Sequence, residues 1–250
     1  MSRNHCQITI VVAGTSLQAA VTLVKLDGAV LLIDSGWPRT RTKLIDGLAQ
    51  QGVRPEDVTH ILHTHLHIDH ATNHSVFSRA VLLVSEAEFH WADDFYRALV
   101  EESDDRRFLS RASPDLPPER IDAAISWINV AREICRKELF QRWDQFRFYE
   151  KNDLPAGVTV VPLFGHTPGH CGISIENTGR ILVAGDALPH AGVSPTEMPA
   201  SDPSLFEKSA RRVQDFEGLI IPGHFPPFRN KKFTTKAQPG RADSKHVIGH

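Results

Sequence analysis

Four histidines and an aspartate lie within eight consecutive residues, His63-Thr64-His65-Leu66-His67-Ile68-Asp69-His70. Neutral imidazole and carboxylate groups are ligands that suit divalent zinc, manganese or iron. Without a metal, so many polar groups in one place would each need another partner. We therefore expect this segment to bind metal, and the pattern His65-x-His67-x-Asp69-His70 offers enough ligands for more than one ion. The alternative is a solvated, histidine-rich turn.

The residues on either side of the motif favour a site over a turn. Residues 58–62 form a short apolar stretch with β-branched side chains, which predicts a strand. Residues 69–74 are polar and are expected to open a helix. In α/β proteins, such a junction places side chains in a crevice at the carboxyl ends of the strands. One loop could then supply His65 and His67 to one metal, and Asp69 and His70 to another.

Three later segments repeat this arrangement of an apolar strand followed by a metal-binding type of side chain. They are residues 158–170, 180–186 and 219–224, and each carries glycine where the backbone must turn closely or unusually. One such ending would be weak evidence, but three in series after the first motif are strong. The side chains at these positions are His166, Asp186 and His224. A further strand, the first of the chain, is predicted at residues 7–12.

Taken together, these positions resemble the metallo-β-lactamase superfamily over nearly the whole chain. Leu32-Ile33-Asp34-Ser35-Gly36 is similar to the early Asp-x-Gly turn of that family. The resemblance implies an α/β fold, a four-layer αββα sandwich made of two similar halves, with a dinuclear site along one edge of the sheets. It also implies a division of the ligands: His65, His67 and His166 at the first metal, Asp69, His70 and His224 at the second, and Asp186 bridging both.

The implied chemistry is hydrolysis with two divalent metal ions, for which zinc is expected and iron or manganese are alternatives. Two cations about 3.5–4 Å apart can bridge a hydroxide and lower the pKa of water from about 15.7 to about 7. Asp69 is expected to orient this hydroxide or take its proton. His190, in the loop after Asp186, is a candidate general acid, or else an exposed loop histidine. His63 and His170 are expected to lie behind the ligands.

Ligating imidazoles need hydrogen-bond acceptors that fix their tautomers, and Asp34 is a candidate for that role. The substrate expected is a small organic ester, lactone or thioester. Quorum-sensing lactonases of the superfamily have a tyrosine three residues after the bridging aspartate, where this chain has Pro189. Glyoxalase II has three contiguous histidines, whereas Thr64 separates His63 from His65 here.

Two other enzyme classes remain as alternatives. The phrases at residues 21–23, 54–59 and 222–228 resemble a small group within the superfamily called metallo-β-lactamase domain-containing protein 1. This resemblance raises a phosphodiesterase or ribonuclease activity as the runner-up. A di-iron redox enzyme on the same scaffold is the other alternative, since histidine and carboxylate ligands also hold iron.

Residues from about 86 to 150 do not resemble the core motifs and are expected to form a helical insertion. Six residues recur there at near-helical spacing: Ile121, Ile125, Ile128, Cys135, Leu139 and Phe146. Aromatic residues are also concentrated in this region. They are expected either to attach helices to the sandwich or to line an apolar pocket or a homodimer interface. The aromatic residues are Phe89, Trp91, Phe95, Tyr96, Trp127, Trp143, Phe146 and Phe148.

The length and net charge of the chain limit its possible domain organisation and its possible partners. The chain of 250 residues is enough for one domain, expected at residues 1–235, with a flexible C-terminal tail at 236–250. A net charge of −2 without a long basic stripe disfavours a nucleic-acid partner and leaves a small-molecule substrate as the expected partner. Three scattered cysteines suggest a reducing compartment, so a cytoplasmic location is expected. No apolar run approaches the length of a membrane span.

Overall fold

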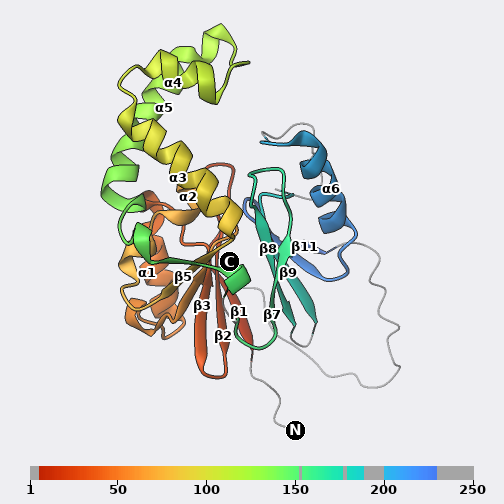
Figure 1. Ribbon diagram of the computed structural model, residues 1–250. Coiled ribbons are helices and arrows are strands. Elements are labelled where there is room, and N and C mark those ends of the chain that lie inside the picture. The colour runs from red at the N-terminus through yellow and green to blue at the C-terminus, as the bar shows by residue number, and fades with distance from the viewer. Residues whose placement is uncertain (1–5, 152–153, 177–178, 189–199, 230–250) are drawn as a thin grey trace.

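Two β-sheets lie face to face, with helices on their outer faces (Figure 1). This computed structural model describes residues 6–151, 154–176, 179–188 and 200–229. The predicted flexible tail at 236–250 and His190 fall outside these ranges. Among the described residues, none of the helices is both long enough and apolar enough to cross a membrane.

The first sheet has six strands in sequential order. The first three run antiparallel to one another, and the third to sixth are parallel. The predicted first strand is confirmed at residues 7–12. The strands are β1 (Gln7–Val12), β2 (Val21–Leu26), β3 (Ala29–Ile33), β4 (His60–Leu62), β5 (Val81–Val84) and β6 (Phe146–Phe148).

The second sheet has five strands in the order β11-β10-β9-β8-β7. Only the β9–β10 pair is parallel among these described strands. A parallel pair brings the carboxyl ends of both strands to the same edge of the sheet, and these are the strands that precede Asp186 and His224. The strands are β7 (Val158–Pro162), β8 (Cys171–Glu176), β9 (Arg180–Gly185), β10 (Leu219–Pro222) and β11 (Phe228–Arg229).

Helices cover both outer faces. α6 covers the outside of the second sheet, and the other helices lie on the side of the first sheet (Figure 1). Ser85, Asp104 and Asp202 cap α3, α4 and α6 with side-chain oxygens that accept backbone N–H groups. The helices are α1 (Arg41–Gln50), α2 (Ile68–Ala71), α3 (Glu86–Glu101), α4 (Asp105–Ala112), α5 (Ile121–Ile134) and α6 (Pro203–Gln214).

Alternation along the strands produces the four predicted layers. On β3, Leu31 and Ile33 face the second sheet, while Leu32 faces the helices, because successive side chains of a strand point to opposite faces. Leu82 and Leu83 on β5 divide in the same way. One apolar core therefore fills the space between the sheets, and each sheet has one further core between it and its helices.

The helical insertion is confirmed as α3, α4 and α5, which rise as an arm beyond the edge of the sheets (Figure 1). The prediction that the helical spacing continues to Phe146 is wrong. After α5 and a π-helical turn (Cys135–Leu139), Arg142 adopts a left-handed conformation, with φ of 60°, which interrupts the helix before a short 3-10 helix at Trp143–Gln145. Phe146 instead begins β6 and pairs with Leu82 of β5.

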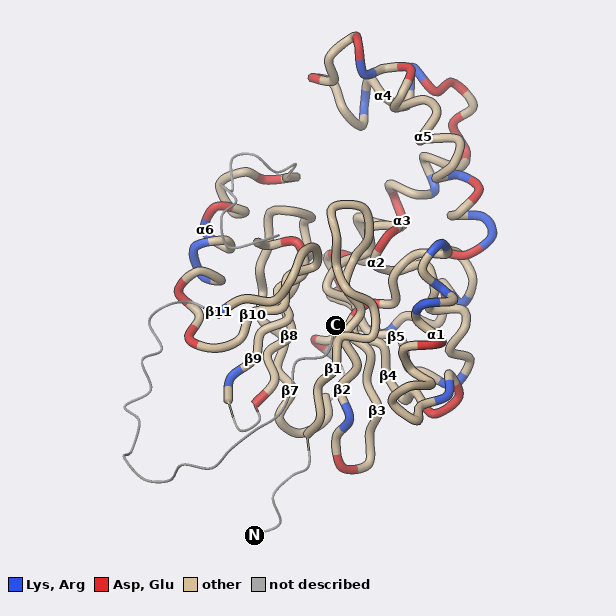
Figure 2. Tube along the Cα trace, turned by 180° about the vertical axis from the view of Figure 1, so that it is seen from behind, with Lys and Arg blue, Asp and Glu red and all other residues tan. Residues whose placement is uncertain are grey.

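Charged residues of both signs are interspersed along the helices (Figure 2). Several form pairs one helical turn apart, such as Arg97 with Asp93 and Arg211 with Glu207. Exposed pairs of this kind contribute little to stability, but they keep a helix face solvated. The mixture of signs offers no broad electrostatic surface over the described helices.

Candidate metal centre

The histidine motif forms a loop between β4 and α2 whose backbone is tied down on several sides. The N–H of His63 donates to Leu83 O on β5, at 2.8 Å, and Thr64 O accepts from the N–H of Cys171 on β8, at 2.8 Å. Leu66 O accepts from the Tyr96 hydroxyl, at 3.0 Å. The loop is thus held by both sheets and by α3, which gives its side chains fixed directions.

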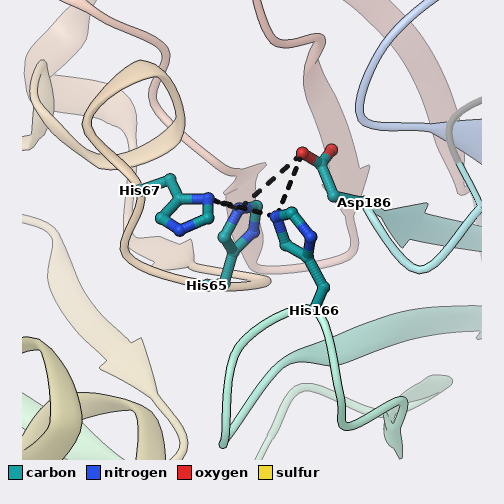
Figure 3. Close-up of side chains that lie close together, drawn as sticks. All are labelled: His65, His67, His166 and Asp186. Atoms are coloured by element: carbon teal, nitrogen blue, oxygen red, sulfur yellow. Dashed lines mark hydrogen bonds and ion pairs between the residues drawn. The ribbon is translucent and has the colours of Figure 1, made fainter. Parts of the chain in front are cut away.

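His65, His67, His166 and Asp186 point toward one another from three separate segments (Figure 3). Nδ1 of His67 lies 3.1 Å from Nε2 of His65 and 3.1 Å from Nε2 of His166. Asp186 Oδ2 is 3.9 Å from His65 Nε2 and 3.5 Å from His166 Nε2. They are the three histidines that the sequence resemblance assigned to the first metal and the aspartate that it assigned as the bridge.

Asp69, His70 and His224 form a second group beside the first. Asp69 Oδ2 is 3.3 Å from His224 Nε2 and 3.9 Å from His70 Nε2. Asp186 also contacts this group, with Oδ1 at 3.4 Å from His70 Nε2 and Oδ2 at 3.5 Å from His224 Nε2. Asp186 therefore lies between the two groups, at the position expected of a bridging carboxylate.

The spacing and chemistry of both groups fit divalent cations. Two ligands at about 2.1 Å from a tetrahedral ion lie about 3.4 Å apart, close to most of the separations here. His70 Nε2 and Asp186 Oδ1 are buried and make no hydrogen bond within the described part of the chain. Buried polar atoms without partners are costly, and a cation between them would remove that cost.

Three of the histidines have a hydrogen bond that selects their tautomer. His70 Nδ1 lies 2.8 Å from Asp34 Oδ2, and His224 Nδ1 lies 2.7 Å from Thr15 O. The Thr64 hydroxyl donates to Asp34, so its oxygen accepts from His65 Nδ1, at 3.0 Å. In the neutral form of each ring the proton sits on Nδ1, which leaves the Nε2 lone pair directed at the cluster.

Asp34 supports the site as the sequence predicted. It follows β3 in a left-handed conformation, with φ of 59°, and is fully buried. Non-glycine residues in this conformation are uncommon and often lie at functional sites. Its carboxylate accepts the Thr64 N–H at 2.8 Å and contacts His70. Burial raises the pKa of Asp34, and the neighbouring His70 limits the rise.

The histidine and aspartate geometry agrees with what comparison with known proteins finds. Residues 14–224 match the Metallo-beta-lactamase superfamily. The chain belongs to this superfamily. Metallo-beta-lactamase domain-containing protein 1 of Xenopus laevis is 29% identical over 231 residues, which cover 91% of this chain and 80% of that protein. This similarity confirms the predicted resemblance to that group.

Solved structures of the superfamily share the fold. A metallo-beta-lactamase-like protein of Thermotoga maritima aligns with a TM-score of 0.59 at 20% identity, covering 90% of this chain and 99% of that one. AidC, a dizinc quorum-quenching lactonase, aligns with a TM-score of 0.55 at 19% identity, covering 83% of this chain and 72% of that one. At these identities the likeness establishes the fold alone.

Two histidines that sequence reasoning placed behind the ligands lie there. His170 is buried, and its Nε2 accepts the backbone N–H of Asp186 at 3.0 Å, which fixes the backbone that carries the bridging position. His63 is buried against Phe146, with ring centroids 5.3 Å apart. His190 and Pro189 lie outside the described residues, so the general acid proposed from sequence has no structural account.

Glu88 is a supporting residue that sequence reasoning missed. It lies in the first turn of α3 and is fully buried. Oε1 accepts the Leu66 N–H at 2.9 Å, while Oε2 accepts the Thr167 hydroxyl at 2.6 Å and the Gly169 N–H at 3.1 Å. One carboxylate thus joins the loop carrying His65 and His67 to the loop carrying His166. The only signal in the sequence was an acid after the N-cap Ser85.

Burial and charge divide the histidines of this superfamily site into two kinds. Burial lowers the pKa of His65 well below its ordinary value and that of His67 to about 3. Burial also acts on His70 and His224, but nearby carboxylates, Asp186 foremost, outweigh it. They raise the pKa of His70 well above its ordinary value and that of His224 to about 10. A metal ligand must be deprotonated, so binding at the second group would release protons.

Two glycines make room for the bridging carboxylate. A methyl group at Gly223 would overlap Asp186 Oδ1 and lie 2.9 Å from His70 Cε1. At Gly185, where φ is 51°, a methyl group would lie 2.7 Å from His170 Nε2 and 2.8 Å from Thr64 Oγ1. Space therefore requires glycine both before Asp186 and before His224, and at Gly185 the left-handed conformation favours glycine as well.

Proposed function

We propose that this protein is a dinuclear zinc hydrolase that cleaves a small organic ester, lactone or thioester. The observation that carries the proposal is the position of Asp186, within 3.5 Å of His166, His70 and His224 and so shared by both ligand groups. Two divalent ions at these groups would lower the pKa of a water molecule to about 7 and polarise a substrate oxygen. The dizinc lactonase AidC, which shares the fold, supports the choice of zinc.

Asp69 is suited to orient the attacking water. Its side chain is 31% exposed, whereas the side chain of Asp186 is 7% exposed, so solvent and substrate reach Asp69. Asp69 also lines the cavity beside the cluster, where a substrate would approach. Coulombic attraction from His70 and a hydrogen bond with His224 lower the pKa of Asp69, so it stays ionised and can accept a hydrogen bond that orients the attacking water.

A phosphodiester substrate is the weaker alternative. Phosphate binding relies on lysine and arginine, and no such residue is among the described residues that line the cavity beside the cluster. A neutral carbonyl compound needs no such partner. The surroundings of the ligand groups therefore favour an ester, lactone or thioester.

Metal content and turnover together test this proposal. The purified protein is expected to contain two zinc ions per chain and to hydrolyse members of a panel of esters, lactones, thioesters and phosphodiesters. The variants His67→Ala and Asp186→Ala should lose metal and turnover. His90→Ala is the matched control, because His90 is exposed on α3. Full activity in either site variant would refute the assigned site, and two iron ions with visible absorption would refute the zinc assignment.

A further inference from the structure

A cavity of about 410 Å³ opens beside the ligand groups and extends between α3, α4 and α5. Its inner end is formed by His67, Ile68 and Asp69 of the histidine motif. This volume lies in the range of small-molecule sites. The remaining lining consists almost entirely of aromatic, aliphatic and alanine side chains of the helical insertion.

Small side chains on facing helices keep this space open. Ala112 on α4 and Ala124 and Ala131 on α5 line it, where larger residues would fill it. Protein interiors are otherwise closely packed, so a large apolar space beside a candidate active site requires an explanation. The aromatic residues of the insertion, which were expected either to attach helices or to line a pocket, form two sets. Phe89, Trp143, Phe146 and Phe148 pack against one another, whereas Trp91, Phe95, Tyr96 and Trp127 line the cavity.

The lining is suited to an apolar group and not to a charged one. From His67, a series of rings leads into the insertion: Trp91 at 5.9 Å between centroids, then Phe95 stacked on Trp91 at 5.5 Å, then Phe108 at 5.6 Å. The Tyr96 hydroxyl donates to Leu66 O and is therefore already satisfied. Away from the motif, Ser113 carries the only other hydroxyl of the described lining, and no charged side chain lies there.

We propose that this cavity binds a linear, apolar acyl chain of the substrate, with the scissile carbonyl carbon at the end formed by His67 and Asp69. This inference rests on the proposed hydrolase function. Hydrolysis forms a bond between the acyl carbon and the oxygen of water and breaks the C–O or C–S bond, and the leaving oxygen or sulfur takes the proton. The carboxylic acid product retains the chain that the insertion has bound.

Chain length is the first test. The p-nitrophenyl esters of acetic, butyric, hexanoic and octanoic acid differ only in buried methylene groups. We expect kcat/KM to rise about fourfold per added methylene until the cavity is full. Hydrolysis of all the esters at equal kcat/KM would overturn the acyl-chain inference and leave the hydrolase function intact. Absence of hydrolysis with every ester and with the wider panel would instead count against the proposed function.

A matched pair of variants locates the effect. Ala124→Trp places a large ring inside the cavity, while Ala123→Trp makes the same change one residue earlier on α5, where the side chain is exposed and does not line the cavity. The ratio of octanoyl to acetyl ester kcat/KM should fall toward one in Ala124→Trp and remain as in the unmodified protein in Ala123→Trp. Equal ratios in the two variants would contradict the assignment.

Direct binding gives a readout that does not depend on turnover. Trp91 and Trp127 line the cavity, so titration with decanol should change tryptophan fluorescence to saturation at one equivalent. The change should be retained in Ala123→Trp and at least tenfold weaker in Ala124→Trp. Circular dichroism of each variant verifies folding, and Ala124→Ile serves as a smaller filling change if Ala124→Trp does not fold. Failure of decanol to bind saturably would overturn the inference.

Discussion

At the scale of single residues, the cluster depends on side chains that hold the ligands as well as on the ligands themselves. Asp34 accepts from Nδ1 of His70 and, through Thr64, determines the tautomer of His65. An acceptor of this kind increases the basicity of a ligating imidazole and fixes its orientation. The carboxylate charge of Asp34 is therefore part of the metal affinity of the second ligand group.

Asp34→Asn tests this support. The amide retains the shape of the side chain but lacks the negative charge, and its NH₂ group faces donors where a carboxylate oxygen accepted. We expect zinc affinity to fall about 10–100-fold, measured by competition with a chromogenic chelator. Asp46→Asn, on the exposed face of α1, is the control. Equal zinc affinity in the Asp34 and Asp46 variants would show that the contact with His70 does not contribute.

Gly223→Ala tests the space around the bridging position. The added methyl group would overlap Asp186 Oδ1, so the carboxylate would have to move away from one ligand group. A displacement of about 1 Å at such a site lowers activity by about 100-fold. Gly179→Ala is the control, because nothing lies within 4 Å of a methyl group there. Steady-state kinetics and zinc content are measured for both variants. Values for Gly223→Ala equal to those of the unmodified protein would refute the predicted clash with Asp186.

At the scale of elements, α3 both supports the ligand loops and lines the cavity. Its first turn buries Glu88 and joins two ligand loops, while its middle presents Trp91 and Phe95 to the cavity. Burial raises the pKa of Glu88 to about 7, and hydrogen bonds from Thr167, Leu66 and Gly169 oppose the rise. The buried carboxylate is thus costly when ionised, yet it is positioned by donors that favour its ionised form.

Glu88→Gln should change how stability depends on pH. A folded pKa of about 7, above the ordinary 4.5, means that the folded state holds a proton that the unfolded state releases. The stabilisation from protonated Glu88 is complete below pH 4.5 and is lost as pH rises through 7, about 3 kcal/mol in total. Glu88→Gln cannot lose this stabilisation, because its amide does not titrate. The unfolding free energy of the variant minus that of the unmodified protein should therefore rise between pH 4.5 and 7.

Urea unfolding of the metal-free proteins at several pH values measures this difference. Glu101→Gln, exposed at the other end of α3, should follow the unmodified protein throughout. The lost hydrogen bonds should also weaken zinc binding in Glu88→Gln, because both ligand loops lose an anchor. A constant free-energy difference between pH 4.5 and 7 would contradict the raised pKa of Glu88.

At the scale of the whole molecule, the ligand groups connect the two sheets. The histidine motif follows β4 in the first sheet, whereas Asp186 and His224 follow β9 and β10 in the second. A cation held by residues from both sheets binds the folded state and not the unfolded chain. Its binding energy therefore adds to the stability of the sandwich as a whole.

Removal of metal should therefore lower the melting temperature. Zinc at 100 times its Kd contributes about 2.7 kcal/mol, which corresponds to about 5–10 °C for a chain of this size. Calorimetry before and after chelation, then after zinc is restored, measures the change. The Asp186→Ala variant, which should not retain the metal, is expected to show little response. A melting temperature that chelation leaves unchanged would argue against binding across the two sheets.

Much of this molecule follows from local sequence patterns. Short apolar runs predict strands such as β9, which ends at the glycine before Asp186. Closely spaced histidines and carboxylates before a helix predict metal binding, because those groups share few other stable arrangements. The position of Asp34 after a strand predicted support for an imidazole, and the structure places it against His70.

Only the tertiary structure determined what depends on residues distant in the chain. Phe146 extends a helical pattern in sequence, but the edge of β5 offers it unpaired hydrogen-bonding groups, and it forms a strand instead. Glu88 has no ligand pattern of its own, and its role depends on Leu66, 22 residues earlier, and Thr167, 79 residues later. The sequence by itself determined which side chains form the two candidate ligand groups. Folding decided which groups hold them in place and which space lies beside them, because packing acts between segments that no local pattern connects.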